Sequence, residues 1–265
     1  MGGIIAMTAT AQQVLQQLID MSHELGQPEY ELAMLGEGNT SALLDDGSFF
    51  VKASGCTLAN ITESRIARLL RAPAEALLDC DLPTDDAILT GLMSVAADDS
   101  GNRPSIESMM HAYLLGIPDI RFVGHTHPIS VNGLLCSTRA EELVNTCLFP
   151  DQVVCCGFAP VFVPFMNPGL ELARMVRERV NAWMDTYGIA PRAVMLQNHG
   201  MFAIGATAQQ VVSCMRMWSK TARVMIGALS CGGINPLTPE QVQRIFTSPD
   251  EKFRAQIIGG LGSQA

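Results

Sequence analysis

Val123-Gly124-His125-Thr126-His127-Pro128 closes an apolar run that predicts a β-strand over residues 121–127. Side chains at positions i and i+2 of a strand point to the same face, so the imidazoles of His125 and His127 can reach one metal ion. The stretch therefore predicts a strand that ends in two metal ligands.

A third imidazole follows in Leu196-Gln197-Asn198-His199-Gly200, between two apolar runs that predict a hairpin over residues 193–204. His125, His127 and His199 are three of the five histidines of the chain. All three lie where a strand meets a loop, and active-site residues are concentrated at such junctions. Three histidine ligands are typical of a catalytic zinc site, which keeps one position open for water or substrate.

The composition limits the class of protein. The chain has 265 residues, 48% of them hydrophobic, and a formal net charge of −9. A chain of this length can bury a large core. The acidic balance argues against a nucleic-acid-binding surface, which would show a basic patch or stripe. No apolar run reaches the roughly 18–20 residues of a membrane-spanning helix, so no membrane partner is expected.

The N-terminal segment and the cysteines favour the cytoplasm. Residues 1–7 carry no basic side chain, and their apolar part is too short for a secretory signal. The eight cysteines include no CxxC pair and give no sign of a disulfide framework. We therefore expect a cytoplasmic protein.

Apolar periodicity and turn residues predict helices and strands along the whole chain. Helices are expected over residues 10–25, 62–71, 84–97, 105–115, from 128, 168–187, 207–229 and 238–246. Strands are expected over residues 41–44, 48–52, 121–127, near 153–155, at 160–163 and in the hairpin 193–204. Because no long linker or repeat interrupts this pattern, a single mixed α/β domain over residues 1–265 is expected, with its core at about 10–230 and a C-terminal helical tail at 231–265.

Glu107 is the candidate general acid or base. It falls in Pro104-Ser105-Ile106-Glu107, in the first turn of the helix predicted over residues 105–115, where the helix dipole stabilises a carboxylate. A capping-box partner occupies the same position, so both roles stay open. His111 lies one turn further on the same face and could hydrogen-bond to Glu107 or contact the metal site.

Two polar loops flank the hairpin predicted over residues 41–52. Gly38-Asn39-Thr40-Ser41 precedes the hairpin and Ala53-Ser54-Gly55 follows it, so both loops lie at one end. Their amides and hydroxyls could form a nest for phosphate or carboxylate, although ordinary turns have the same composition. Lys52 adds one cation beside the second loop.

Five motifs follow one another along the chain as an ordered set. They are Gly38-Asn39-Thr40-Ser41, Lys52-Ala53-Ser54-Gly55, Pro104-Ser105-Ile106-Glu107 with His111, Gly124-His125-Thr126-His127-Pro128 and Asn198-His199-Gly200. In order and approximate spacing this set resembles the class II aldolase/adducin family over about residues 10–230. The resemblance implies a three-layer α/β/α fold around a central mixed, largely antiparallel sheet, assembled as a homotetramer with active sites between subunits. It also implies a divalent metal, most often Zn²⁺, on His125, His127 and His199, and imidazoles accept Mn²⁺, Fe²⁺ or Co²⁺ as well.

The family's L-fuculose-1-phosphate aldolase-like members imply roles for the matching positions. Glu107 would be the catalytic acid or base, and the substrate's phosphate would be bound by Asn39, Ser54, Gly55 and Ser105. The chain departs from those aldolases at Ile106, where they often have a second serine. It also has no tyrosine near residues 148–150, where their catalytic tyrosine falls.

A metal-dependent aldolase is the first functional hypothesis. A metal on three neutral imidazoles keeps its charge and its open positions, so it can chelate the adjacent oxygens of a hydroxy-ketone or hydroxy-acid. It would stabilise the enediolate left by carbon–carbon cleavage, and Glu107 would protonate that carbanion. The expected substrate is a small anionic molecule such as a sugar phosphate.

Two alternatives stay open. A decarboxylase or a 4-epimerase would use the same metal and the same enediolate chemistry, and the missing serine and tyrosine keep these reactions as real alternatives to the aldolase. A non-catalytic interaction domain of the adducin type would lack the metal ligands, so the intact histidines and Glu107 argue against it.

Overall fold

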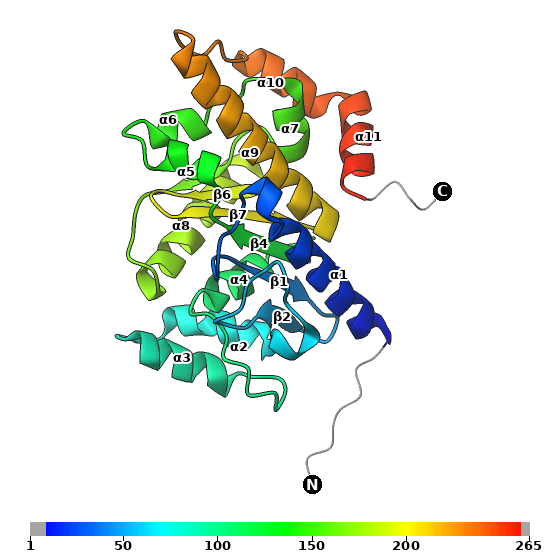
Figure 1. Cartoon of the computed structure of the whole chain (residues 1–265), viewed down its shortest axis with the longest axis vertical. Helices are drawn as coiled ribbons and strands as arrows, with labels where there is room; N and C mark the ends of the chain where they lie inside the picture. The colour runs from blue at the N-terminus through cyan, green and yellow to red at the C-terminus, as the bar shows by residue number, and fades with distance from the viewer. Residues whose placement is uncertain (1–8, 261–265) are drawn as a thin grey trace.

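The computed structural model describes residues 9–260, and a seven-stranded sheet with helices on both faces lies at its centre (Figure 1). The strand order is β3-β2-β1-β4-β7-β6-β5. All neighbouring strands are antiparallel except β5 and β6, which are parallel. The expected three-layer fold around a mixed, largely antiparallel sheet is confirmed.

The strands are short, and successive side chains point to opposite faces of the sheet. In β2, Phe49 and Val51 join one apolar cluster and Phe50 joins the other. The strands are β1 (Asn39–Leu43), β2 (Ser48–Lys52), β3 (Ile66–Leu70), β4 (Phe122–Thr126), β5 (Val161–Val163), β6 (Ala193–Leu196) and β7 (Gly200–Gly205).

Each face of the sheet is covered by its own group of helices. One apolar cluster joins the sheet to α1 (Ala9–Leu25), α5 (Ile129–Leu135), α6 (Ala140–Val144), α7 (Pro150–Cys156) and α9 (Ala208–Ser230). The other joins it to α2 (Arg71–Ala76), α3 (Asp85–Ser94), α4 (Ser108–Leu114) and α8 (Leu170–Tyr187). Three short 3₁₀ helices are η1 (Pro28–Tyr30), η2 (Glu63–Arg65) and η3 (Leu77–Asp79).

The C-terminal part of the described chain forms α10 (Pro239–Thr247) and α11 (Pro249–Ile258), which pack on α7 (Figure 1). A capping box of Thr238 and Gln241 starts α10, so the helix expected over residues 238–246 is confirmed. Helix α11 lies within the helical tail expected over residues 231–265, although no separate helix was expected there. Arg254 of α11 pairs with Asp151 of α7 at 2.7 Å.

The helix expected over residues 62–71 is wrong. After η2, residues 66–70 form β3, which pairs with β2 from Leu70 opposite Ser48 to Ile66 opposite Lys52. In so short a segment the apolar residues fit the spacing of a helix as well as that of a strand. Pairing with an existing strand decides between the two conformations.

The strand expected near residues 153–155 is also wrong, because these residues lie in α7. Pro150 occupies the start of this helix, where a missing N–H has no cost. The run Val153-Val154-Cys155 is too short for periodicity to separate a strand from a buried helix.

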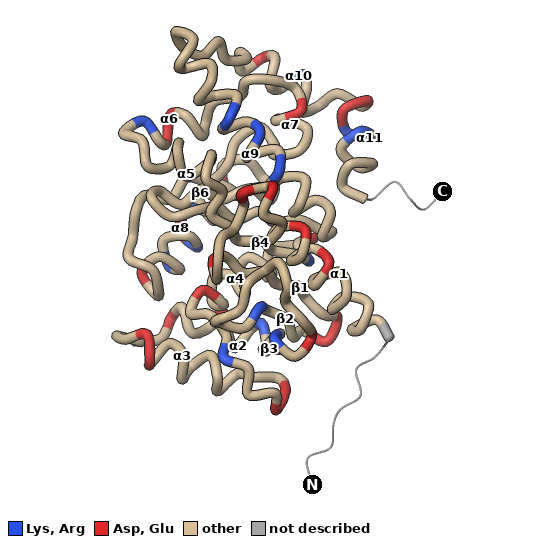
Figure 2. Tube along the Cα trace, in the orientation of Figure 1, with Lys and Arg blue, Asp and Glu red and all other residues tan. Residues whose placement is uncertain are grey.

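Charged side chains of both signs are interspersed over the molecule (Figure 2). On α9, Arg216 pairs with Glu24 at 3.1 Å and Arg223 pairs with Glu31 at 2.5 Å. Among the helices of residues 9–260, none has the length and hydropathy needed to cross a bilayer.

Candidate metal centre and acid–base site

Strand β4 positions two imidazoles as the sequence predicts. His125 lies in the strand opposite Asn39 of β1 and Phe202 of β7. His127 directly follows the strand, and its backbone N–H donates to the Leu32 carbonyl at 2.9 Å. Because the two residues are separated by one position, their side chains share a face.

The third imidazole comes from the tight turn between β6 and β7. Leu196 pairs with Gly200 across the turn, and Asn198 adopts a left-handed φ of 55°. The side-chain amide of Asn132 on α5 donates to the His199 carbonyl at 3.0 Å. This contact ties the turn to the helix that follows β4.

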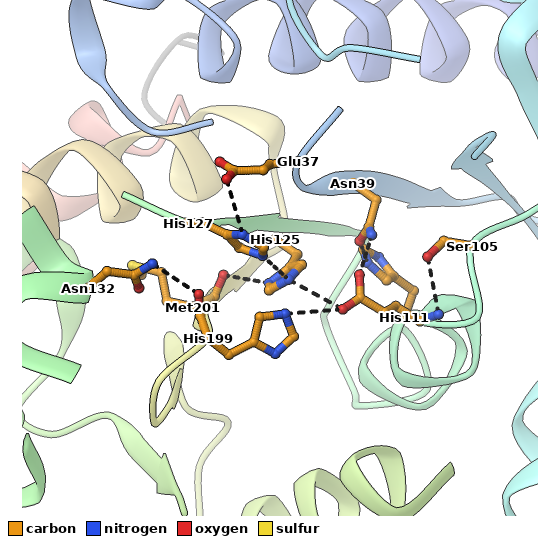
Figure 3. Close-up of polar contacts among 10 residues, drawn as sticks. Glu37, Asn39, Ser105, His111, His125, His127, Asn132, His199 and Met201 are labelled. Atoms are coloured by element: carbon orange, nitrogen blue, oxygen red, sulfur yellow. Dashed lines mark hydrogen bonds and ion pairs between the residues drawn. The ribbon is translucent and has the colours of Figure 1, made fainter. Parts of the chain in front are cut away.

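The three imidazole rings converge (Figure 3). Their centroids lie 4.9, 5.1 and 4.9 Å apart, and one ring nitrogen from each of His125, His127 and His199 lies within 4.8 Å of the others. The Nε2 atoms of His125 and His127 are 3.1 Å apart. Two ligands of a tetrahedral zinc, each about 2.0–2.1 Å from the metal, stand about 3.3 Å apart, so this donor set fits a divalent metal.

The surroundings of His125 and His199 favour the neutral form of the imidazole, which binds a metal. Burial lowers the pKa of His125 well below its usual value, and the neighbouring imidazoles lower it further. Burial also lowers the pKa of His199, although Glu107 acts in the opposite direction. His125 Nδ1 donates to the Met201 carbonyl at 3.0 Å, which leaves its Nε2 lone pair for the cluster.

Glu107 joins this cluster from the residue just before α4, not from the first turn of the helix as expected. Its Oε1 lies 3.6 Å from His125 Nε2 and 3.5 Å from His199 Nε2. Its side chain makes no capping hydrogen bond to α4, so the capping-box role is not observed. The candidate acid or base and the three imidazoles therefore form one site.

A buried hydrogen-bond network holds the other oxygen of Glu107. Asn39 Nδ2 donates to Glu107 Oε2 at 2.6 Å, and Asn39 Oδ1 accepts from His111 Nε2. Ser41 Oγ donates to His111 Nδ1 at 2.6 Å. Burial lowers the pKa of His111 to about 3, so the ring is neutral and its partners fix the tautomer. Both ends of the Asn39 amide are thus engaged within the protein.

Gly38 allows Asn39 to lie against β4. Its φ is 72°, and a Cβ at this position would lie 2.5 Å from the His125 carbonyl oxygen. Strand β1 consequently begins at Asn39, two residues earlier than expected, which places Asn39 in a strand and not in a loop.

The second polar loop lies beside the segment that leads into Glu107. Ala53 forms a bridge with Pro104, and the Ser54 N–H donates to the Arg103 carbonyl at 2.8 Å. Ser54 and Gly55 are exposed. Ser105 Oγ accepts from the backbone N–H of Glu107 at 3.3 Å.

Lys52 is a buried cation next to this loop. The residue is 3% exposed, and its Nζ donates to the Ala53 carbonyl at 3.5 Å. Burial lowers the pKa of Lys52, while the charges of Cys56 and Glu107 raise it. Within the described part of the chain its ammonium has no carboxylate partner at ion-pair distance.

Sequence reasoning missed two side chains that contact the histidines. Glu37 Oε1 lies 3.9 Å from His127 Nδ1, and the Phe202 ring stacks on His125 with centroids 4.3 Å apart. A carboxylate directly before the first polar loop was the available signal for Glu37. No pattern in the sequence marks Phe202, because its place depends on the register of β4 and β7.

Most of the chain matches one known protein family. Residues 16–226 match the family model described as the Class II Aldolase and Adducin N-terminal domain.

Two curated relatives are about a quarter identical to the chain over the residues that align with it. The protein named uncharacterized oxidoreductase YuxG of Bacillus subtilis (strain 168) is 26% identical over 207 residues, 74% of this chain and 27% of that protein. The chain therefore spans about a quarter of that relative's length. Methylthioribulose-1-phosphate dehydratase of Geobacillus kaustophilus (strain HTA426) is 25% identical over 177 residues, 64% of this chain and 80% of that enzyme.

Two solved structures share the fold. YgbL from Escherichia coli, described as a candidate aldolase/epimerase/decarboxylase, superposes with a TM-score of 0.68 at 20% identity over 90% of this chain and 100% of its own. An L-fuculose 1-phosphate aldolase does so with a TM-score of 0.68 at 19% identity over 95% of this chain and 100% of its own. At this identity the likeness establishes the fold alone.

Proposed function

Because the chain belongs to the class II aldolase and adducin N-terminal domain family, we propose that it is a metal-dependent aldolase acting on a small anionic hydroxy-carbonyl compound. The observation that carries this proposal is the convergence of three imidazoles with the Glu107 carboxylate. Members of this family include enzymes named as aldolase and dehydratase, and both reactions move a proton at a carbon beside a carbonyl.

We assign the metal to His125, His127 and His199, with zinc as the expected ion. The free Nε2 atom of His125 and its 3.1 Å separation from His127 Nε2 support the assignment. A divalent ion bound there would act as a Lewis acid toward the carbonyl and hydroxyl oxygens of the substrate.

Glu107 is the residue to which we assign proton transfer. Asn39 holds Oε2 at 2.6 Å, and this contact orients Oε1 toward the imidazoles. Glu107 Oε1 can therefore return a proton to the substrate carbon after cleavage or remove it before condensation. His111 keeps the Asn39 amide in the orientation that donates to Glu107.

The proposed contacts to the anionic group of the substrate are Lys52, Ser54, Gly55, Ser105 and Asn39. The exposed loop at residues 54–55 offers a hydroxyl and backbone amides, and Lys52 adds a positive charge nearby. Asn39 would have to exchange one of its two hydrogen bonds to reach a substrate. The loop and Lys52 therefore carry most of the proposed anion recognition.

Product analysis tests the aldolase proposal. The metal-loaded protein is incubated with a panel of hydroxy-ketone phosphates and their unphosphorylated or carboxylate analogues, and NMR follows the products. An aldolase splits a substrate into two carbonyl compounds, and Glu107→Gln should not. Products that keep the intact carbon skeleton would contradict the proposal.

Dehydration is a second candidate, because the Geobacillus kaustophilus relative is named as a dehydratase. The chain has no tyrosine near residues 148–150, where the aldolases that it resembles have their catalytic tyrosine. Tyr113 of α4 is engaged elsewhere, because its hydroxyl donates to Asn181 of α8 at 2.8 Å. A reaction that relies on Glu107 for the carbon-bound proton is compatible with this arrangement. In the same NMR experiment, loss of water indicates a dehydratase, release of carbon dioxide a decarboxylase, and inversion at one carbon an epimerase.

The homotetramer with active sites between subunits and the cytoplasmic location belong to the same proposal. The resemblance to the family supports the assembly. Light scattering on the purified protein and cell fractionation test the two points separately.

A further inference from the structure

A cavity of about 270 Å³ lies between the C-terminal helices and the rest of the molecule. Residues of α7 and α9 line it on one side, and residues of α10 and α11 line it on the other. A smaller cavity of about 60 Å³ shares Val154, Arg192, Gln210 and Ala255 with it. Helices α10 and α11 lie beyond residues 16–226, so the family model covers only the α7 and α9 side of this cavity.

Arg192 lines both cavities. One of its N–H groups donates to the Val154 carbonyl, and within residues 9–260 the guanidinium pairs with no carboxylate. By contrast, Arg254 of α11 is paired with Asp151 at 2.7 Å. A partly buried guanidinium with free N–H donors offers the planar fork that binds a carboxylate or a phosphate.

The remaining polar lining also favours an anion. Lys252 and Gln256 border the larger cavity. Glu251 is the carboxylate among its lining residues, and its Oε2 lies 3.5 Å from Arg254 Nη1. Burial raises the pKa of Cys155, in the smaller cavity, to about 11, so its thiol is neutral and does not repel an anion.

The other walls of the larger cavity are apolar. They include Val153 of α7, Ala255 of α11 and the side chains of Ile245 and Phe246 on α10. Phe246 packs edge-on against Phe158 with ring centroids 5.0 Å apart, which holds the aromatic wall in place. A volume just below the roughly 300–1,000 Å³ of most ligand pockets fits a small molecule with one acidic group.

We propose that this cavity binds a small organic acid, with its carboxylate or phosphate on Arg192 and Lys252 and its apolar body against Ile245 and Phe246. The ligand would join α10 and α11 to α7 and α9. The site is separate from the imidazole cluster, so it provides a binding function beyond the proposed catalysis.

Isothermal titration of the full-length protein tests the proposal with benzoate, phenyl phosphate, neutral benzamide and inorganic phosphate. Benzoate or phenyl phosphate should bind, benzamide should not, and inorganic phosphate should bind more weakly than phenyl phosphate. Arg192→Gln and Lys252→Gln should each weaken binding by about tenfold or more, because each removes charge-assisted hydrogen bonds. Arg179→Gln, at an exposed position on α8, is the matched control and should bind as wild type does.

Hydrogen exchange then locates the ligand, which should protect amides of residues 239–258. Lys252 is exposed and makes only a backbone contact to Ser248, so its variant keeps the test valid if Arg192→Gln fails to fold. The proposal is overturned by no saturable binding to wild type, by equal binding of benzamide, by unchanged affinity in both variants or by protection confined to residues 107–127. Equal affinity for inorganic phosphate and phenyl phosphate would overturn the role of the apolar wall.

Discussion

Asn39 connects two parts of the candidate site through the two ends of one amide. Its oxygen accepts from His111, and its nitrogen donates to Glu107 at 2.6 Å. A carbonyl oxygen can only accept and an amide nitrogen can only donate, so the neutral tautomer of His111 determines which end faces Glu107. The orientation of the Asn39 amide that contacts the Glu107 carboxylate thus depends on the His111 ring, which does not touch the carboxylate.

Glu107→Gln should leave the metal content unchanged and lower turnover at least about 100-fold, because an amide cannot accept and return the proton. Exchange of the substrate's α-hydrogen with solvent deuterium measures the step directly. Glu141→Gln on α6, where the side chain is exposed, is the control and should exchange as wild type does. Unchanged exchange in Glu107→Gln would reassign the base.

His111 should make the protein less stable in mild acid. Its pKa is about 3 in the folded state and about 6.5 when unfolded, so the unfolded chain binds the extra proton between these values. The contribution of this group to the free energy of unfolding is therefore fully present above pH 6.5, and it falls as the pH drops toward 3. From pH 6.5 to pH 5 the loss due to this group is about 2 kcal/mol.

Urea unfolding at several pH values measures this effect. His111→Gln should be less stable at pH 7, yet it should lose about 2 kcal/mol less than wild type between pH 6.5 and pH 5. Parallel curves for the two proteins would contradict the assignment to His111.

Single residues show what the sequence could and could not predict about the site. His125, His127 and His199 were predictable, because strand alternation and a turn define where such residues point. The network from Ser41 to Glu107 was not, since it requires Asn39 to stand opposite His125. That register joins segments more than eighty residues apart, and a local pattern carries no information about it.

At the scale of elements, local pattern predicted the long helices and missed the segments that tertiary pairing defines. Helices α1, α8 and α9 have many turns of consistent apolar spacing, and they were predicted nearly to their ends. Strand β3 and helix α7 are five and seven residues long, and each was assigned to the wrong type. In such short segments the neighbouring strand or helix decides the conformation.

Gly38→Ala tests how β1 is set against β4. The substitution strains a residue at φ 72° and places Cβ 2.5 Å from the His125 carbonyl oxygen, which the sheet holds in place. We expect a loss of at least about 3 kcal/mol in the free energy of unfolding, together with weaker metal binding.

Gly47→Ala is the matched control for this variant. Its φ is 81°, and a Cβ there meets no atom within 4 Å, so only the backbone strain of about 1–2 kcal/mol applies. Urea unfolding and metal titration compare the two variants. Equal losses of stability would show that the contact with His125 has no effect.

At the scale of the whole molecule, the two apolar clusters lie on opposite faces of one continuous sheet. Strands β1 and β4, which hold Asn39 and His125, are central in that sheet and contribute to both clusters. We therefore propose that residues 1–265 form a single domain with residues 231–265 as its tail. Limited proteolysis should release the tail before it cuts within residues 10–230.

The metal should stabilise the entire domain, because its ligands come from strand β4 and from the turn between β6 and β7. A ligand present at about 100 times its dissociation constant adds about 2.7 kcal/mol to the free energy of unfolding. For a domain of this size the melting temperature should fall by about 5–10 °C when a chelator removes the metal, and zinc should restore it. His127→Gln should abolish this difference, whereas His23→Gln on α1 should keep it. Calorimetry combined with elemental analysis gives the measurement, and an unchanged melting temperature after verified loss of the metal would place the ion outside the three imidazoles.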